Sequence, residues 1–554
     1  MKKKINIAVV GLGNIGSYFC NEIVKKKKDI LLKTGINLNL LYVSAKNKNK
    51  KRPFKFKNKQ WIHQPLNITN DPAVDIIVEL IGGSEGLAKK VVISALKNKK
   101  HVITANKALI AKHGNYLAYL AEKNKVNFEY EASVASGIPI IRCIKEGLIS
   151  NKISKLIGIL NGTSNYILSR MEWTGKNFNE ILKEAIKFGY AESNPKSDLN
   201  GDDVASKIRI LSSLCFHTQI SGNNILIDGI YNIENKDIIN AKKLGYRIKL
   251  LGITEMINKN IFERVHPCLI DINSYIGNIN GVFNASIINS SPVGQTILQG
   301  EGAGPGPTSS ALMSDLYSIL RGNIKYPFIT PYKLRKKIKQ FNYSNYSYSC
   351  YLRFEVKDKP GVLSSITKNL SENKISIEKL MQIPDKKKRT ASINIITHKT
   401  VEKRIIKCLY KLKKNKHIIK SPTFIRVVDI NGNLVGINSM KIASEQVEGI
   451  GFAIPINKAK RIINDLIRYG KVRRGWLGVS VQGMTKEMLR FFHIDRIRGV
   501  VVTQVMEESP GARAGLKQGD VILSLENNEV SDKSDYSERV STYPVGNTIY
   551  MMGL

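Results

Sequence analysis

Short apolar runs alternate with amphipathic stretches through the first part of the chain. The runs are "INIAVV" (5–10), "NLLYVSA" (39–45), "VDIIVELIGG" (74–83) and "HVITANKAL" (101–109). Helix-like segments such as "SYFCNEIVKKK" (17–27) lie between them. This alternation is typical of a parallel sheet with crossover helices. We therefore predict an α/β domain over residues 1–145.

The pattern changes further along the chain. Apolar strands and long helices predict an α+β domain at 146–330, ending near "GPTSSALMSDLYSILRG" (306–322). The polar segment 331–349 is predicted to be a linker, and 350–428 a compact unit. The last segment, 429–554, has glycine at nearly every strand boundary, and we divide it into 429–470 and a mostly-β segment, 471–554.

Composition excludes several classes of protein. The 554 residues are 42% hydrophobic and 24% charged, as in a globular chain with sizeable cores. A net charge of +41 would normally suggest nucleic acid, but the lysines are scattered through every segment without a nucleic-acid motif. Six distant cysteines without a C-x-x-C pair fit a reducing cytoplasm. We expect neither a nucleic-acid partner nor a membrane-spanning segment.

The string "GLGNIG" (11–16) joins the first predicted strand to the first predicted helix. In this setting Gly11 permits a tight turn, Gly13 lets the backbone reach a pyrophosphate, and Gly16 lets helix and strand pack closely. Backbone amides at the helix start, around Asn14 and Ile15, would face the phosphates. The sequence thus predicts a Rossmann-type domain that binds a dinucleotide.

The end of the second predicted strand bears on the choice of nicotinamide cofactor. NAD-preferring sites usually have Asp or Glu there, which holds the ribose diol. This chain instead has "YVSAKNKNKKR" (42–52), with Lys46 and no acid. These cations would attract a 2′-phosphate, so NADP(H) is favoured and NAD(H) is the alternative. The same lysines also fit a solvated loop.

The stretch "GYAESNPKSDLNGDDVASK" (189–207) gathers four carboxylates in a strongly basic chain. A calcium loop is excluded, because Asp203 stands where glycine is needed and Arg209 where glutamate is needed. Asp203 and Lys207 are four residues apart, so they share one helix face and can pair. A pocket for a polar amino acid needs such partners, since each buried charge must be compensated.

Seven strings occur in order across the first 316 residues. They are "GLGNIG", "VELIGG" (78–83), "TANKALIA" (104–111), "YEASVASGIPII" (130–141), "NGTSNYIL" (161–168), the acidic stretch 189–207 and "GEGAGPGPTSSALMSDL" (300–316). Together they resemble the homoserine dehydrogenase family over about residues 1–428. The resemblance implies reversible NAD(P)H-dependent reduction of L-aspartate 4-semialdehyde to L-homoserine, in threonine and methionine biosynthesis.

The resemblance also implies roles for individual residues. Glu192 and Asp203 would bind the substrate, and Thr163 would line its carboxylate. Lys207 would lie near the reacting oxygen and donate the proton, and Lys107 would be a second cation that lowers its pKa. The implied catalytic residues are Lys207, Lys107 and Asp203. The implied cofactor contacts are Gly11, Gly13, Asn14, Ile15, Gly16, Lys46, Lys107, Gly189 and Gly302.

The string "EASVASGIP" (131–139) implies a monovalent cation site, with sodium as the ion in relatives. Its ligands would be Glu131 and the carbonyls of Val134, Ser136 and Ile138. Ser136 stands where glycine is usual in the family. Carbonyl coordination survives that change if the backbone angles are kept.

The last third of the chain resembles two further families. "YLRFEVKDKPGVLSSITKNLSENKISIEKLMQ" (351–382) resembles an ACT domain, a βαββαβ module, which implies an amino-acid effector such as threonine and a homo-oligomer. Residues 429–470 resemble the end of a Deg/HtrA-type protease domain, and 471–554 a truncated PDZ domain. The segment with the nucleophilic serine is missing, so we expect no proteolysis. "WLGV" (476–479) could receive a peptide C-terminus.

Two functions from different classes follow from these patterns. The first is an NADP(H)-dependent homoserine dehydrogenase with an ACT domain and a non-catalytic tail. The second is a peptide-binding adaptor whose dehydrogenase half is an inactive scaffold. Glu192, Asp203, Lys207 and the glycine turn favour the enzyme, whereas the "WLGV" loop supports the adaptor.

Overall fold

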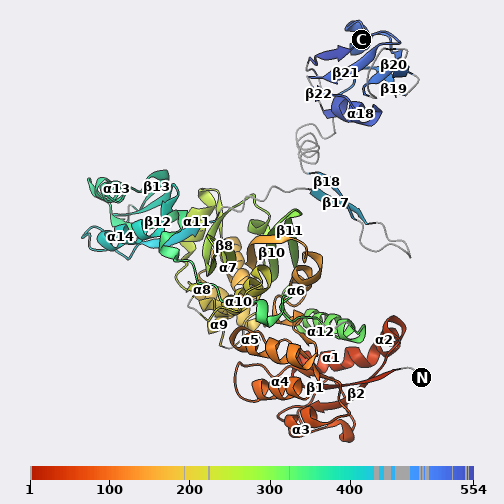
Figure 1. Ribbon diagram of the computed structural model, residues 1–554. Coiled ribbons are helices and arrows are strands. Elements are labelled where there is room, and N and C mark those ends of the chain that lie inside the picture. Colours follow the sequence, from red (N-terminus) through yellow and green to blue (C-terminus); the bar gives the residue numbers. More distant parts are fainter. Residues whose placement is uncertain are drawn as a thin grey trace. The chain divides into compact units, whose positions relative to one another are not determined.

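The structure is a computed structural model of the chain. It describes residues 3–192, 194–222, 225–322, 325–385, 387–428, 436–441, 451–455, 475–485, 488–489, 492, 498–526, 528–542, 546 and 548–553. The chain divides into two compact units, Met1–Asn431 and Gly432–Leu554 (Figure 1).

The first unit begins with a five-stranded parallel sheet in the order β2-β1-β3-β4-β5. Its strands are β1 (Lys4–Val10), β2 (Asn37–Ser44), β3 (Ile76–Glu79), β4 (His101–Thr104) and β5 (Phe128–Glu129). Its helices are α1 (Asn14–Lys25), α2 (Lys27–Thr34), α3 (Pro65–Asn70), α4 (Leu87–Lys97) and α5 (Lys107–Asn124). The predicted α/β fold is confirmed, and the strand order reverses at β1, where such sheets bind nucleotides.

Both faces of this sheet are buried, as in other parallel sheets. Successive residues of β1 point to opposite faces, so Ile7 and Val9 belong to one hydrophobic cluster while Ala8 and Val10 belong to another. Helix α12 (Pro305–Leu320) returns from late in the chain and packs beside α1 in the first cluster (Figure 1). The nucleotide sheet is therefore completed by a distant segment.

The second sheet has eleven strands, in the order β11-β10-β6-β8-β9-β16-β12-β14-β13, with β7 and β15 at its side. Its first part comprises β6 (Lys152–Ile159), β7 (Leu226–Ile227), β8 (Tyr246–Ile257), β9 (Asn260–Asp271), β10 (Phe283–Ser291) and β11 (Gly294–Glu301). The accompanying helices are α6 (Ile140–Arg142), α7 (Gly162–Thr174), α8 (Phe178–Lys187), α9 (Lys196–Asn200), α10 (Asp202–Phe216) and α11 (Asn235–Lys243).

The rest of this sheet is the predicted βαββαβ module. It comprises β12 (Ser347–Lys357), α13 (Val362–Glu372), β13 (Ile377–Asp385), β14 (Thr390–Thr397), β15 (Thr400–Val401), α14 (Glu402–Leu412) and β16 (Thr423–Val427). Strand β16 pairs in parallel with β9, where Arg426 faces Cys268. The module's sheet is thus continuous with the substrate-domain sheet, a joint that the sequence did not predict.

The segment predicted as a linker is packed rather than loose. Arg335 is only 2% exposed, and its guanidinium lies 4.5 Å from the ring centre of Phe328. Gln340 forms a bridge with Ile261 of β9. Residues 331–346 therefore run along the substrate domain, and the last three residues of the predicted linker, 347–349, already belong to β12.

The second unit contains a small β-sheet in the order β19-β20-β21-β22, with β23 paired to β21. Its elements are β19 (Val479–Gly483), β20 (Val500–Val505), α17 (Pro510–Arg513), β21 (Val521–Leu525), β22 (Asn528–Glu529), α18 (Lys533–Thr542) and β23 (Met551–Gly553). A hairpin of β17 (Gly436–Lys441) and β18 (Gly451–Pro455) precedes it. Most of the predicted protease remnant, 429–470, lies outside the described residues. Among the helices that the structure describes, none could span a membrane.

Candidate active site

A cavity of about 890 Å³ lies at the carboxyl end of the nucleotide sheet. Its walls come from the start of α1, the loop after β4, the starts of α7 and α10, and the loop between β11 and α12. The lining residues with charged or polar side chains are Lys107, Ser133, Ser136, Asn161, Thr163, Tyr190, Glu192, Asp198, Asp203, Lys207, Asn284, Glu301 and Thr308. The acidic stretch 189–207 and the nucleotide turn therefore meet in one place.

Asp203 holds two lysines at the centre of this cavity. Its Oδ2 accepts a hydrogen bond from Lys207 Nζ at 2.7 Å, across one turn of α10 as the spacing predicted. Its Oδ1 lies 2.9 Å from Lys107 Nζ, which comes from the first residue of α5. A lysine at a helix start faces the positive end of the helix dipole, so Lys107 needs such a carboxylate.

Burial and charge set the pKa values of these three groups in different directions. Burial acts to raise the pKa of Asp203, but Lys207 and Lys107 outweigh it and hold the pKa well below its usual range. Burial lowers the pKa of Lys207 despite the attraction of Asp203, and Lys107 lowers it further. Asp203 raises the pKa of Lys107, which is more exposed. Lys207 is the cation that gives up a proton more readily.

Lys207 has a donor available for a ligand. Its ammonium carries three N–H groups. One bonds to Asp203, and another to the Leu160 carbonyl oxygen at 2.5 Å. Because Lys207 lines the cavity, its third N–H group is the one that a ligand there would use.

Asn161 organises the carboxylates, a role that our sequence reasoning did not assign to it. Its Nδ2 donates to Asp203 Oδ2 at 2.9 Å and to Asp198 Oδ1 at 2.8 Å. Its Oδ1 accepts from Ser164 N and caps the start of α7. Burial and the neighbouring Asp203 raise the pKa of Asp198. An Asn directly before a helix-forming "GTSNYIL" is a helix-capping signal, which predicts the bond to Ser164 N but not the contacts with Asp198 and Asp203.

The remaining predicted substrate residues lie at the cavity rim. Glu192 lines the cavity but is exposed, in contrast to the buried Asp203. Thr163 Oγ1 donates to the Tyr190 carbonyl at 2.6 Å, which ties the start of α7 to the loop that carries Glu192. Gly189, a predicted cofactor contact, lies on the same loop and also lines the cavity.

The glycine turn after β1 fits a dinucleotide. A Cβ on Gly11 would lie 2.4 Å from Leu80 O, and one on Gly16 would lie 1.9 Å from Gly11 O, so neither position accepts a side chain. A Cβ on Gly13 would meet nothing within 4 Å, which leaves open space at the start of α1. Ile15 and Gly302 line the cavity next to this space. The turn is therefore shaped to admit a ligand at the helix start.

The basic loop after β2 is folded against this turn. Arg52 Nε donates to Leu12 O at 3.0 Å, and its NH1 donates to Lys48 O at 3.1 Å. Lys46 is exposed at the end of β2 and does not line the cavity. Lys46 follows the end of β2, where Ser44 O accepts a hydrogen bond from Gly11 N at 2.8 Å, and Arg52 joins the basic loop to the glycine turn.

Glu131 lies under the cavity as a buried helix cap. Its carboxylate accepts from Ile141 N at 3.0 Å and from Arg142 N at 2.7 Å. Burial raises the pKa of Glu131 to about 7, although these backbone donors and Arg142 oppose the shift. Ser136, from the same predicted cation site, lines the cavity and bonds to Gly302 O through its backbone N–H at 3.1 Å. Ile138 is buried beside them.

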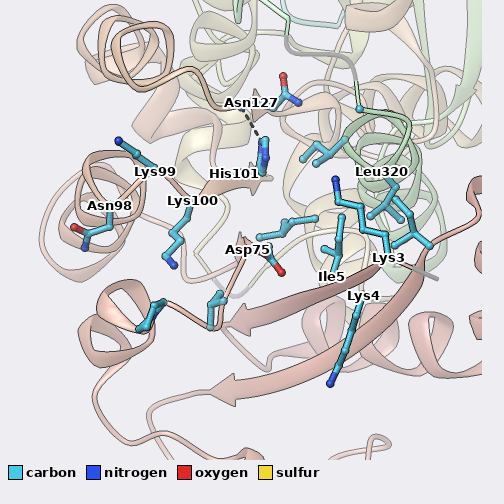
Figure 2. A pocket seen from close by; sticks show the side chains of 16 residues that line it. Lys3, Lys4, Ile5, Asp75, Asn98, Lys99, Lys100, His101, Asn127 and Leu320 are labelled. Carbon is cyan, nitrogen blue, oxygen red and sulfur yellow. Dashed lines mark hydrogen bonds between the residues drawn. The ribbon is translucent and has the colours of Figure 1, made fainter. Parts of the chain in front are cut away.

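A second cavity, of about 520 Å³, lies at the amino end of the same sheet (Figure 2). It is bordered by lysines, but the amino groups of Lys4, Lys99 and Lys100 point in different directions. Lys100 Nζ is bound to Asp71 O at 2.7 Å. The C-terminal ends of α4 and α12 lie at this edge, and cations are favoured at the C-terminal end of a helix. The lysines here are explained without a ligand.

The first cavity is therefore the candidate active site, and the glycine turn beside it is typical of NAD(P)-dependent oxidoreductases. Models of the homoserine dehydrogenase NAD binding domain and of homoserine dehydrogenase match residues 11–131 and 139–317. Models of the ACT domain and the PDZ domain match residues 351–413 and 475–552.

Relatives of the same name cover this part of the chain. Homoserine dehydrogenases from Neisseria gonorrhoeae and Helicobacter pylori are 37% and 39% identical, over 77% of this chain and 100% of theirs. A solved homoserine dehydrogenase from Thiobacillus denitrificans has a TM-score of 0.71 and 35% identity, over 77% of this chain and 99% of its own. The chain belongs to the homoserine dehydrogenase family. It interconverts L-aspartate 4-semialdehyde and L-homoserine with a nicotinamide cofactor.

Proposed function

We propose that the reaction takes place in the 890 Å³ cavity, with Lys207 as the proton donor. The observation that carries this proposal is the shared carboxylate of Asp203, which binds Lys207 at 2.7 Å and Lys107 at 2.9 Å. When bound, the reduced nicotinamide supplies the hydride. Lys207 gives its cavity-facing proton to the aldehyde oxygen as that oxygen gains negative charge. In the oxidation of homoserine the neutral amine takes the proton back.

The other cavity residues hold the substrate. The ammonium of the amino acid lies between Asp203 and Glu192, and its carboxylate lies at the start of α7, near Thr163. Backbone N–H groups at a helix start attract an anion. The buried Asp203 provides the fixed charge, and the exposed Glu192 lets the substrate enter.

The test is Lys207→Met in the full chain. Lys107 still compensates Asp203 in this variant, so the protein should fold and bind NADPH. Turnover should fall by about 10³-fold, a typical effect of removing a general acid. Lys196→Met, an exposed lysine of the same acidic stretch, is the matched control and should keep normal rates. If turnover of Lys207→Met stays within tenfold of that of the unsubstituted chain, Lys207 is not the proton donor.

NADP(H) is the proposed cofactor, bound with its 2′-phosphate beside Lys46 and the Arg52 loop. This loop contains no carboxylate, and Arg52 holds it against the glycine turn at Leu12 O. Lys46→Glu should raise the KM for NADPH about tenfold and leave the KM for NADH nearly unchanged, since one charge contact is replaced by repulsion. Equal effects on both cofactors would contradict the preference.

A sodium ion is proposed at Glu131 with the carbonyls of Val134, Ser136 and Ile138. Support comes from the burial of this carboxylate, which raises its pKa to about 7, an effect that a bound cation would oppose. Activity measured in sodium and in tetramethylammonium at equal ionic strength tests it. Equal rates would count against a cation site.

The remaining partners are proposed from the two added modules. Threonine would bind the ACT module at the turn before α13, where Gly361 has a φ of 82°, and homo-oligomers would form. Inhibition by threonine tests the first point, and the mass of the purified protein in solution tests the second. The PDZ domain would bind a peptide with a free C-terminal carboxylate at "WLGV" (476–479). An amidated peptide that bound equally well would contradict this mode.

A further inference from the structure

Lys249 is a buried lysine of β8 whose partners are all neutral oxygens. Its side chain is among the largest fully buried ones, at 1% exposure. Its Nζ donates to Ile279 O at 2.6 Å, Asn280 Oδ1 at 2.9 Å and Asn165 Oδ1 at 3.1 Å. Ser169 Oγ, at 3.5 Å, is a fourth and more distant acceptor, and the three shorter contacts match the three N–H groups of an ammonium.

The acceptors come from two segments that lie far apart in the sequence. Asn165 belongs to α7, while Ile279 and Asn280 belong to the segment 279–283, which ends at the first residue of β10. Asn165 Nδ2 also donates to Ile279 O at 3.2 Å and to Phe283 O at 3.1 Å. Ser169, one turn further along α7, accepts from Gly281 N at 3.2 Å. Lys249 is therefore at the centre of a closed network between α7 and this segment.

Both segments continue into the walls of the active cavity. Gly162 and Thr163, the first residues of α7, line it, and so do Val282 and Asn284. The two walls touch, because a Cβ on Gly162 would lie only 2.7 Å from Val282 O. A small shift of the segment relative to α7 would therefore change the part of the cavity assigned to the substrate carboxylate.

An amine at this position has an energetic cost that packing alone does not explain. Burial lowers the pKa of Lys249 to about 7, Glu172 of α7 opposes the shift, and Arg247 of β8 reinforces it. An apolar side chain of similar volume is usually at least as stable in a core. It would, however, leave the Ile279 and Asn280 oxygens without this donor. Even as a neutral amine Lys249 keeps two N–H groups for them.

We propose that Lys249 is a positioning residue, which ties segment 279–283 to helix α7 and thereby fixes the substrate side of the cavity. It does not touch the substrate itself. The proposal rests on the placement of homoserine against Asp203 and the start of α7. The expected consequence is an effect on substrate binding that is larger than the effect on cofactor binding.

The first experiment compares Lys249→Met with Lys100→Met in the full chain. Lys100 is also buried and donates to a backbone carbonyl, but at the opposite end of the nucleotide sheet. Lys249→Met should raise the KM for homoserine about tenfold, since small misplacements of substrate are costly. The KM for the cofactor should stay within about twofold. Lys100→Met should change neither KM, whatever it does to thermal stability.

A second variant keeps the test decisive if Lys249→Met does not fold. Asn280→Ala removes one acceptor of the network and should raise the KM for homoserine about threefold. In the double variant the two effects should be less than additive, because both act through one bridge. Full additivity would overturn the proposal. An unchanged homoserine KM in Asn280→Ala, or equal rises in the KM values for homoserine and cofactor, would also overturn it. Failure of the proposed active site is a separate outcome, which normal turnover in Lys207→Met would reveal.

Discussion

Two buried aspartates of the first unit lie near the starts of helices and pair with cations in different ways. Asp203, on α10, shares its two oxygens between Lys207 and Lys107. Asp237, on α11, is fully buried and binds one arginine of β12 with both oxygens, Arg353 Nε at 2.6 Å and NH2 at 3.1 Å. A lysine can release a proton at neutral pH when it is buried, whereas an arginine cannot.

The surroundings of the two aspartates also differ, because Asp203 faces a cavity and Asp237 lies in a closed network. Asp203 lines an open cavity, and Lys107 beside it is half-exposed. Arg353 is 3% exposed and also binds Glu355, and the adjacent Asn240 and Asn394 bond to each other at 2.9 Å. This second network joins α11 to the ACT sheet (Figure 1). In our proposal the first ion pair contains the group that moves a proton, whereas the second holds α11 against the ACT sheet.

The strongest test of this difference is the pair Asp203→Asn and Asp237→Asn. Asp203→Asn removes the clamp for the substrate ammonium and leaves two lysines in mutual repulsion, which favours a neutral Lys207. Turnover per folded molecule should fall by about 10³-fold. Asp237→Asn should leave it within about threefold. Similar losses of turnover in both variants would show that the two sites are not functionally distinct.

The reverse ranking is expected for stability. Asp237→Asn leaves Arg353 buried with only part of its compensation, and breaking a buried pair costs about 3 kcal/mol. Asp203→Asn should cost less, because its lysines can lose a proton or reach the cavity. Urea unfolding of both variants measures the two values. A larger loss in Asp203→Asn would mean that its pairing serves the fold as much as the chemistry.

The first of these two sites could largely be predicted from sequence. Asp203 and Lys207 are one helical turn apart, and the glycine turn has a fixed spacing, so local geometry was enough to place them. Lys107 was predicted as a second cation from its motif alone. Its contact with Asp203 is a tertiary distance, which no spacing along the chain determines.

The second site was not predicted, for a physical reason. Asp237 and Arg353 occur in ordinary amphipathic segments, and their pairing depends on how β16 joins β9 and brings β12 over α11. The same holds for Lys249, which the composition presents as one of many surface lysines. A charged residue in a strand that is otherwise apolar, such as "RIKLLGI" (247–253), was the available signal.

A smaller effect is expected on the pH profile. Reduction of the semialdehyde needs protonated Lys207, so kcat/KM should fall as pH rises through its lowered pKa, and homoserine oxidation should gain over the same range. Lys107→Met removes a cation that lowers this pKa, so the falling limb should move to higher pH. Arg353→Met should not move it. If the falling limb stays in place in Lys107→Met, Lys107 does not influence the pKa of Lys207.

The smallest effect is expected from the tail, which lies outside both networks. Asp203 and Asp237 belong to the unit Met1–Asn431. The homoserine dehydrogenases from Neisseria gonorrhoeae and Helicobacter pylori match 77% of this chain over their whole length, so they have no counterpart of the remaining part. A chain ending at residue 428 should therefore keep kcat and both KM values within about twofold, since a compact domain folds on its own. Its unfolding midpoint in urea should equal that of the first transition of the full chain. A loss of activity in the shortened chain, together with a shifted midpoint, would mean that the PDZ unit stabilises the enzyme. The two aspartate networks would then not be enough to explain the activity and stability of the first unit.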